Sequence, residues 1–258
     1  TEVNEPLSRA GYDVTNLERF GLMIRNSENA AYNYHKQMVS SGNAWSTSDG
    51  QQMLWDAERT PVTMIAYAPY MSEAAPDASL VVNALTNQTT EENVKSSDFL
   101  LMKATVDPEQ DLTADGKLKI SLSHAMSKLL IKITVNGTTD AAMNKLGDMS
   151  INGAVVNGIC DLSATVPIVV PAPDAVVATV APYKGTESCE CILPPQKIVE
   201  GFSVNFSYDG KLYIWTAKEA IELEKGVEHT LTLNVNTTVR LAAKMARNWA
   251  TGQLIDRN

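Results

Sequence analysis

Short runs of alternating apolar and polar residues fill most of the chain. Side chains in a β-strand point alternately to opposite faces, so such runs predict strands with one buried face. Gly, Asn, Asp or Pro stands at the margins of these runs, as expected where a strand ends in a turn. Helical periodicity is scarce and predicts only short helices or turns at 89–95 and 139–146. The segments with strand pattern are 17–24, 61–67, 98–103, 117–122, 129–135, 202–208, 211–216 and 230–235.

The clearest turn lies between two of these runs. Asp209-Gly210 separates 202–208 from 211–216. An Asp-Gly pair in this position favours a type I′ hairpin, because both central residues need a positive φ. Many short strands, with few helices to carry parallel crossovers, predict an all-β fold of antiparallel sandwiches.

A polar break after a strong strand divides the chain. It reads Asn136-Gly137-Thr138-Thr139-Asp140. A cut there gives an N-terminal domain of residues 1–137 and a C-terminal domain of residues 138–258, both of ordinary size for a β-sandwich. The two halves close with similar alternating strands, "LLIKITVNG" and "HTLTLNVNT", which supports the division.

The alternation changes phase shortly before that break. The apolar residues Ile120 and Leu122 occupy even positions, whereas Leu129 and Ile131 occupy odd positions. A shift of one residue moves the buried set to the other face of a strand. The intervening segment 123–128 contains one of only 3 histidines, so it is a candidate either for an active site or for a structural device.

Composition narrows the classes of function. The 258 residues are 44 % hydrophobic and 20 % charged, which is typical of globular proteins. A net charge of −9 argues against nucleic acid as a partner, because few cations are left to neutralise phosphates. No stretch approaches the roughly 20 apolar residues that cross a bilayer. The sequence begins at Thr1 without methionine, so we expect any targeting segment to have been removed.

Motifs for chemistry are missing from the sequence. No metal-binding His spacing, nucleophile elbow or glycine-rich phosphate loop occurs. We therefore expect no metal, no cofactor and no enzymatic activity, and we interpret the histidines as strand-end or turn residues. Cys189 and Cys191 lie on one face of a strand and cannot easily bridge each other. Three buried thiols, or a disulfide from Cys160 to one of that pair, are both open.

Tryptophans are the remaining candidates for a binding site. Trp215 shares a strand face with Tyr213, which indicates a core position. Trp45 lies in the polar segment "SSGNAWSTSDGQQ", where packing explains a large aromatic less easily. Trp45 is therefore a candidate for stacking on a glycan.

Several segments together resemble one family. They are "TPVTMIAYAPY" (60–70), "SDFLLMKA" (97–104), "ISLSHAMSKLLIKI" (120–133), "CILPPQ" (191–196) and "DGKLYIW" (209–215). In this order they are similar to the fimbrillin-like proteins of Bacteroidales, a group of pilus subunits and related surface lipoproteins. The resemblance runs from about residue 7 to 235 and implies two tandem Ig-like or transthyretin-like β-sandwich domains. It also implies that 123–128 is a tight connection or bulge, with Ser127 and Lys128 as structural residues.

The resemblance implies polymerisation at the cell surface. Such subunits are exported as lipoproteins to the outer membrane, anchored only by an N-terminal lipid on the precursor, and trimmed after an arginine. Trimming removes the first strand, and a strand from a neighbouring subunit fills the vacated groove by β-augmentation. Arg9-Ala10 matches the processing position. Other fimbrial subunits are the implied partners, in a homo- or hetero-polymer, together with a host or bacterial surface ligand.

The C-terminal tail is the candidate donor strand. Alternation continues beyond Val235, so residues 239–258 could present an apolar face. A short amphipathic helix and a strand docked on the chain's own sheet remain open alternatives. The alternative function is a monomeric surface lipoprotein that binds a glycan or host ligand. The donor-strand candidates are Val239, Leu241, Met245 and Trp249.

Overall fold

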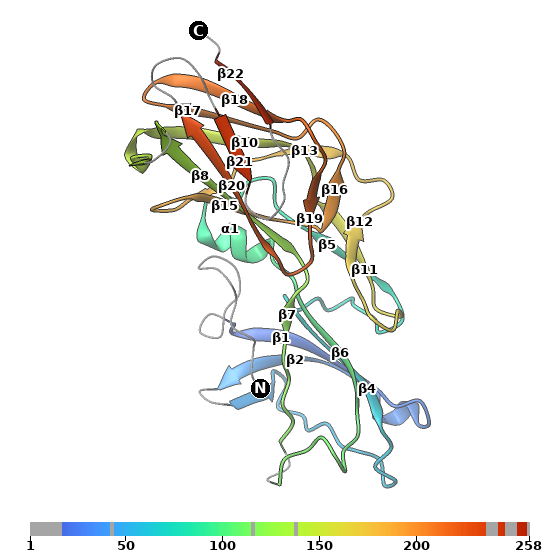
Figure 1. The fold of residues 1–258 in the computed structure, drawn as a ribbon. Coiled ribbons are helices and arrows are strands. Elements are labelled where there is room, and N and C mark those ends of the chain that lie inside the picture. The colour runs from blue at the N-terminus through green and yellow to red at the C-terminus, as the bar shows by residue number, and fades with distance from the viewer. Residues whose placement is uncertain are drawn as a thin grey trace.

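The computed structural model describes residues 17–41, 44–114, 117–136, 139–235, 242–245 and 252–256. Over these residues the fold is all-β and built from several sheets, as the alternation predicts. Helical structure in the described ranges is limited to α1 (Glu91–Ser96) and the 3-10 turns η1 (Ala30–Tyr32) and η2 (Met143–Lys145). Figure 1 shows an elongated molecule, with an N-terminal sheet at one end and the C-terminal sheets at the other.

The N-terminal sheet is antiparallel and has six strands. Its order is β3-β2-β1-β4-β6-β7. The predicted strand at 117–122 is wrong, because Leu118 makes only an isolated bridge to Leu112. The apolar residues there fill the core without joining a ladder. The bounds are β1 Arg19–Arg25, β2 Tyr34–Ser41, β3 Ala44–Thr47, β4 Val62–Ala68, β6 Leu100–Val106 and β7 Ser123–His124.

Two sheets, one of six strands and one of five, form most of the C-terminal part. One has the order β14-β15-β8-β20-β21, with β9 attached to β8, and the other has the order β13-β10-β17-β18-β22. The β8–β20 pair is parallel. The bounds of the first sheet are β8 Ser127–Val135, β9 Thr139–Asp140, β14 Tyr183–Lys184, β15 Cys189–Leu193, β20 Glu228–Val235 and β21 Ala242–Met245. Those of the second are β10 Leu146–Val155, β13 Val177–Val180, β17 Ser203–Tyr208, β18 Lys211–Ala217 and β22 Gly252–Asp256.

The predicted Asp-Gly hairpin is confirmed between β17 and β18. Asp209 has φ 50° and Gly210 has φ 78°, which is the pair of positive values that a type I′ turn needs. The register Tyr208↔Lys211 closes the hairpin directly around these two residues. Trp215 is fully buried and Tyr213 nearly so, which confirms that this face of β18 belongs to the core.

Smaller sheets lie beside the junction of the two parts. The antiparallel sheet β12-β11-β5 consists of β5 (Ser79–Asn83), β11 (Asn157–Asp161) and β12 (Val169–Pro171). A two-stranded ladder joins β16 (Gln196–Ile198) and β19 (Ile221–Leu223). Because β5 pairs with β11, a strand from early in the chain joins one from its second half.

The phase change in the sequence marks the passage from one core to the other. Leu122 belongs to a cluster on the N-terminal sheet, whereas Leu129 belongs to the large C-terminal cluster. The segment between them forms the short strand β7, which pairs with β6, and then enters β8. A structural connection is therefore present here, and it carries the chain between two sheets.

The predicted division at residue 137 remains a prediction. The strand pairing bears on it, because β8 ends at Val135 and yet pairs with β15 and β20 from beyond that position. A division that follows the sheets falls between β7 and β8.

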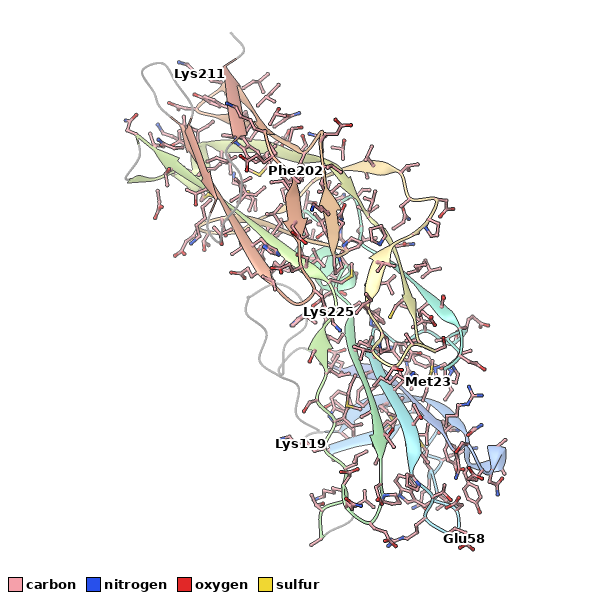
Figure 2. All side chains as sticks on the ribbon, turned by 45° about the vertical axis from the view of Figure 1, so that its right-hand side comes forward. Met23, Glu58, Lys119, Phe202, Lys211 and Lys225 are labelled. Atoms are coloured by element: carbon pink, nitrogen blue, oxygen red, sulfur yellow. The ribbon has the colours of Figure 1, made fainter. Side chains whose placement is uncertain are left out.

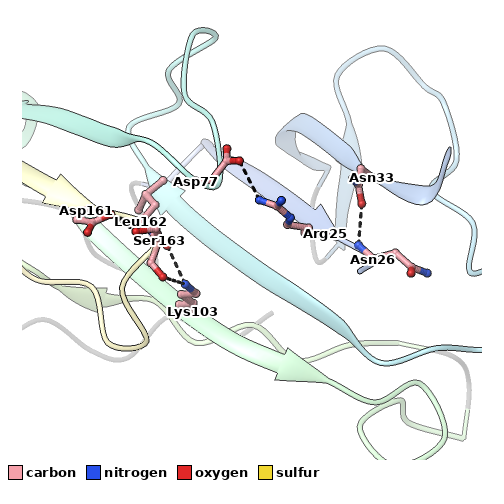
Figure 3. Close-up of polar contacts among 8 residues, drawn as sticks. All are labelled: Arg25, Asn26, Asn33, Asp77, Lys103, Asp161, Leu162 and Ser163. Atoms are coloured by element: carbon pink, nitrogen blue, oxygen red, sulfur yellow. Dashed lines mark hydrogen bonds and ion pairs between the residues drawn. The ribbon is translucent and has the colours of Figure 1, made fainter. Parts of the chain in front are cut away.

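Apolar and polar contacts join the two parts. One hydrophobic cluster contains both Met23 of β1 and Phe202 beside β17, which lie in different parts of the molecule (Figure 2). At the edge of this contact, Lys103 Nζ donates to the carbonyls of Leu162 and Ala164 at 2.8 Å each. Arg25 forms an exposed ion pair with Asp77 at 3.1 Å (Figure 3). These contacts tie β1 and β6 to the segments that flank β5 and β11.

Candidate functional site

Both faces of the N-terminal sheet are apolar. On one face, Met23, Ile65 and Leu101 pack into the large C-terminal cluster. The opposite face carries a second cluster of its own. Strand register aligns this second face in rows, since Ile24 of β1 lies beside Tyr34 of β2 and Met64 of β4. This second face therefore needs a cover other than the C-terminal sheets.

In the described part of the chain, this second face is covered by irregular segments rather than by a facing sheet. One is residues 48–60, here named the strap, which connects β3 to β4. The other is the β6–β7 loop, described over residues 107–114 and 117–122. They leave a cavity of about 820 Å³ between themselves and the sheet. Its lining includes Phe20, Leu22, Ile24, Tyr32, Met38, Trp45, Met53, Trp55, Val62, Met64, Leu112, Leu118 and Ile120.

A polar network closes one end of the cavity. Asn26 Nδ2 donates to Asp56 Oδ2 at 2.7 Å, and Asn26 N donates to Asn33 Oδ1 at 2.7 Å. Hydrogen bonds from Thr60 hold the pKa of the Asp56 carboxyl below its usual value. Asp56 therefore accepts hydrogen bonds as a carboxylate at neutral pH and fixes the end of the strap.

Trp45 lies at the rim of this cavity. It belongs to β3, is partly buried, and packs edge-to-face on Phe20 with ring centroids 4.9 Å apart. Packing thus explains much of its position, and a glycan contact remains a prediction. Trp55 also lines the cavity. The sequence offered Trp55 only as one of four tryptophans that could stack on a sugar, without evidence that placed it beside Trp45.

The predicted processing and donor residues are mostly outside the described residues. Arg9, Ala10, Val239, Leu241 and Trp249 all fall there. Met245 ends β21, where its backbone partner is Leu231 of β20. Farther along, β22 pairs with β18. The two described pieces of the tail thus lie on edges of the chain's own C-terminal sheets.

The histidines make structural contacts. His35 Nε2 is 2.8 Å from the Tyr67 hydroxyl. His124 Nδ1 lies 2.8 Å from Oδ2 of the buried side chain of Asp98. His229 Nε2 accepts a hydrogen bond from the backbone of Glu224. Within the described ranges, no group of three or more His, Cys, Asp or Glu side chains is arranged to hold a metal ion.

The cysteines are free and buried. Burial raises the pKa of the Cys160 thiol to about 11 and that of Cys189 to about 12, and it also raises the pKa of Cys191. All three therefore stay protonated at neutral pH and behave as small core residues. No helix in the described ranges is long and apolar enough to span a membrane.

Solved structures share this fold across nearly the whole chain. A candidate cell adhesion protein from Bacteroides uniformis aligns with a TM-score of 0.68 at 16 % identity, covering 98 % of this chain and 94 % of its own. Another from Bacteroides ovatus aligns with a TM-score of 0.64 at 17 % identity, covering 99 % and 96 %. A fimbrial protein from Bacteroides ovatus aligns at 0.53 and 16 % identity, covering 85 % and 45 %.

Sequence comparison gives the family. No curated protein is similar enough to this chain to match it. The profile described as fimbrillin-like matches residues 8–248, which is most of the chain and includes every segment on which the resemblance rested. The expectation from those segments is confirmed: the chain belongs to the fimbrillin-like family.

Proposed function

We propose that this protein is a structural subunit or accessory adhesin of a bacterial surface fimbria, assembled by strand exchange. The observation that carries this proposal is the apolar cavity on the N-terminal sheet, floored by Ile24 and Met64 and covered by irregular segments. Membership of a family of fimbrial and adhesion proteins supports a location at the cell surface. The protein has a binding role in this account and catalyses no reaction.

The cavity suits an incoming β-strand. Alternate apolar side chains of such a strand would occupy the space above Leu22, Ile24 and Met64, as side chains of a facing sheet do in a sandwich. Burial of apolar area at about 25 cal/mol per Å² supplies the driving force. The cavity would be an aggregation hazard if it were always open, so the timing of its opening matters.

Processing at Arg9 is the proposed trigger. Cleavage between Arg9 and Ala10 removes an N-terminal strand, after which residues 239–258 of a neighbouring subunit fill the cavity. The precursor is anchored at the outer membrane by an N-terminal lipid before this step. Pairing of β21 and β22 with the chain's own sheets means that the tail must leave those edges before it is donated.

Limited digestion tests the proposal. An arginine-specific protease should produce a new N-terminus at Ala10, followed by SDS-resistant ladders on unheated gels. The Arg9→Lys variant keeps the charge, removes the cleavage site and should give no ladders. Deletion of residues 239–258 should abolish ladders without affecting cleavage. Cleavage at Arg9 with a chain that stays monomeric would contradict strand exchange.

The second candidate function is binding of a glycan or host ligand by a monomer. Trp45 and Trp55 line a cavity whose volume lies within the range of small-ligand sites. A glycan array probed with the monomeric protein tests this function. Binding that disappears in Trp45→Ala, and persists in the matched variant Trp249→Ala, would favour the ligand-binding role.

A further inference from the structure

The strap is attached to the N-terminal sheet through side chains of β2. Tyr34 contributes its hydroxyl to both backbone groups of Leu54, accepting from Leu54 N at 3.1 Å and donating to Leu54 O at 3.2 Å. Two residues along the same face of β2, Lys36 Nζ contacts Asp49 Oδ2 at 2.6 Å and Gln51 Oε1 at 3.0 Å. Residues 51–56 themselves form no regular secondary structure.

The ends of the strap are fixed by Ser48 N, which donates to Gln37 O, and by the buried Asn26–Asp56 hydrogen bond. Between these ends, the attachments through Tyr34 and Lys36 are open to water. The Lys36 side chain is 20 % exposed and that of Asp49 is 41 % exposed, so their ion pair is screened by solvent. Each neutral hydrogen bond at Tyr34 contributes modestly, because water replaces it when the strap lifts. A segment held in this way opens locally far more often than the strands beneath it.

The strap also forms the roof of the cavity. Met53, Leu54 and Trp55 all border the cavity. Met53 and Trp55 are partly buried against the cluster on this face, whereas Leu54 between them is 62 % exposed. This alternation indicates an extended path across the face, with the side chains of Met53 and Trp55 toward the sheet. A strand laid on β1 and β4 would compete for the space that Met53 and Trp55 now fill.

We propose that the strap is a displaceable cover of the cavity, held shut by Tyr34 and Lys36, and that its release sets the rate at which a strand from a second copy of this chain inserts. This inference rests on the proposed function for the identity of the inserted strand. The proposal that the strap is displaceable depends only on the contacts of the strap, and not on which strand is inserted.

Binding kinetics test the cover. The probe is a labelled synthetic peptide of residues 236–258, mixed with the full chain after treatment with the arginine-specific protease. Loss of the two Tyr34 hydrogen bonds in Tyr34→Phe should raise the association rate about tenfold and leave the dissociation rate unchanged. The matched control is Tyr70→Phe, because Tyr70 packs beside His35 on the opposite face of the sheet, with ring centroids 5.5 Å apart.

Two results would overturn the proposal that the strap is a displaceable cover. An unchanged association rate in Tyr34→Phe means that release of the strap is not limiting. A raised dissociation rate with an unchanged association rate means that the strap contacts the bound peptide and retains it, and does not block its entry. If Tyr34→Phe unfolds, Lys36→Met loosens the same strap from another position and should show the same acceleration.

A second probe separates this inference from the proposed function. If no variant binds the peptide, strand exchange by this tail fails. In that case, the rate at which a small apolar fluorescent dye enters the cavity tests whether the strap is a displaceable cover. Faster entry in Tyr34→Phe than in Tyr70→Phe supports a displaceable cover, and equal rates refute it.

Discussion

Lys128 and Glu190 form a buried ion pair across two strands, with 2.5 Å between Lys128 Nζ and Glu190 Oε2. Their side chains are 8 % and 11 % exposed. The register places Lys128 opposite Ile192 and Glu190 opposite Leu130, so the pair is diagonal on one face of β8 and β15. Lys128 is the second residue of β8, the strand that enters the C-terminal part, so the pair anchors the start of that strand to β15.

Removal of the lysine alone should be costly. Lys128→Met leaves the Glu190 carboxylate buried without its cation, and we expect a loss of about 3 kcal/mol in the free energy of unfolding. Urea unfolding measures the change. The double variant Lys128→Met/Glu190→Leu should recover most of the loss, while Lys132→Met, an exposed lysine on the same face of β8, should be nearly neutral. A single variant as stable as the parent would show that the pair is not buried in solution.

Lys103 should stabilise the contact between the two parts of the molecule. Its ammonium group donates to three consecutive carbonyls, those of Leu162, Ser163 and Ala164. We expect Lys103→Met to cost about 2 kcal/mol and to speed hydrogen exchange around 162–164. Hydrogen exchange followed by mass spectrometry measures this. Lys211→Met, at the far end of the molecule (Figure 2), is the control, and equal exchange in the two variants would refute the role of Lys103.

His35 should make stability depend on pH. Burial lowers the pKa of His35 below 6.5, so the unfolded chain binds a proton more readily than the folded one. Stability is therefore full above about pH 6.5 and falls as the pH drops from there toward the folded pKa. Thermal unfolding between pH 7 and 5 should show a smaller decline in His35→Gln than in the parent.

A neighbouring change checks the assignment to His35. Gln37 lies two residues along the same face of β2 and does not titrate, so Gln37→Asn should keep the pH dependence of the parent. If the stability of His35→Gln falls with decreasing pH as steeply as that of the parent, another group causes the acid sensitivity.

Local pattern predicted the strands better than their partners. Asp209-Gly210 defined a hairpin that the structure confirms, because a type I′ turn depends on two adjacent residues. The polar break at Asn136 predicts a domain boundary from an equally local pattern, and that boundary remains a prediction. Which sheet receives β8 is decided by its parallel pairing with β20, 100 residues away, in which Thr134 faces Asn234. No local signal encodes that pairing.

The candidate site shows the same limit. Trp45 stood out in the sequence because a large aromatic interrupts a polar segment. The cavity that it lines was not predictable, because the lining combines residues of β1, β2, β3, β4, the strap and the β6–β7 loop. Tyr34 gave no signal either, since its contacts are to the backbone of Leu54, and backbone partners leave no mark on residue type.

Cross-linking between isotopically distinct copies tests strand exchange most directly. Lys117 lines the cavity and Lys244 lies in β21 of the tail. Copies labelled with ¹⁴N and ¹⁵N are mixed, treated with the arginine-specific protease, and cross-linked through lysines before mass spectrometry. We predict Lys117–Lys244 links that join a light copy to a heavy copy, and only after cleavage. Links confined to single copies, or polymers without this link, would contradict insertion of the tail into the cavity.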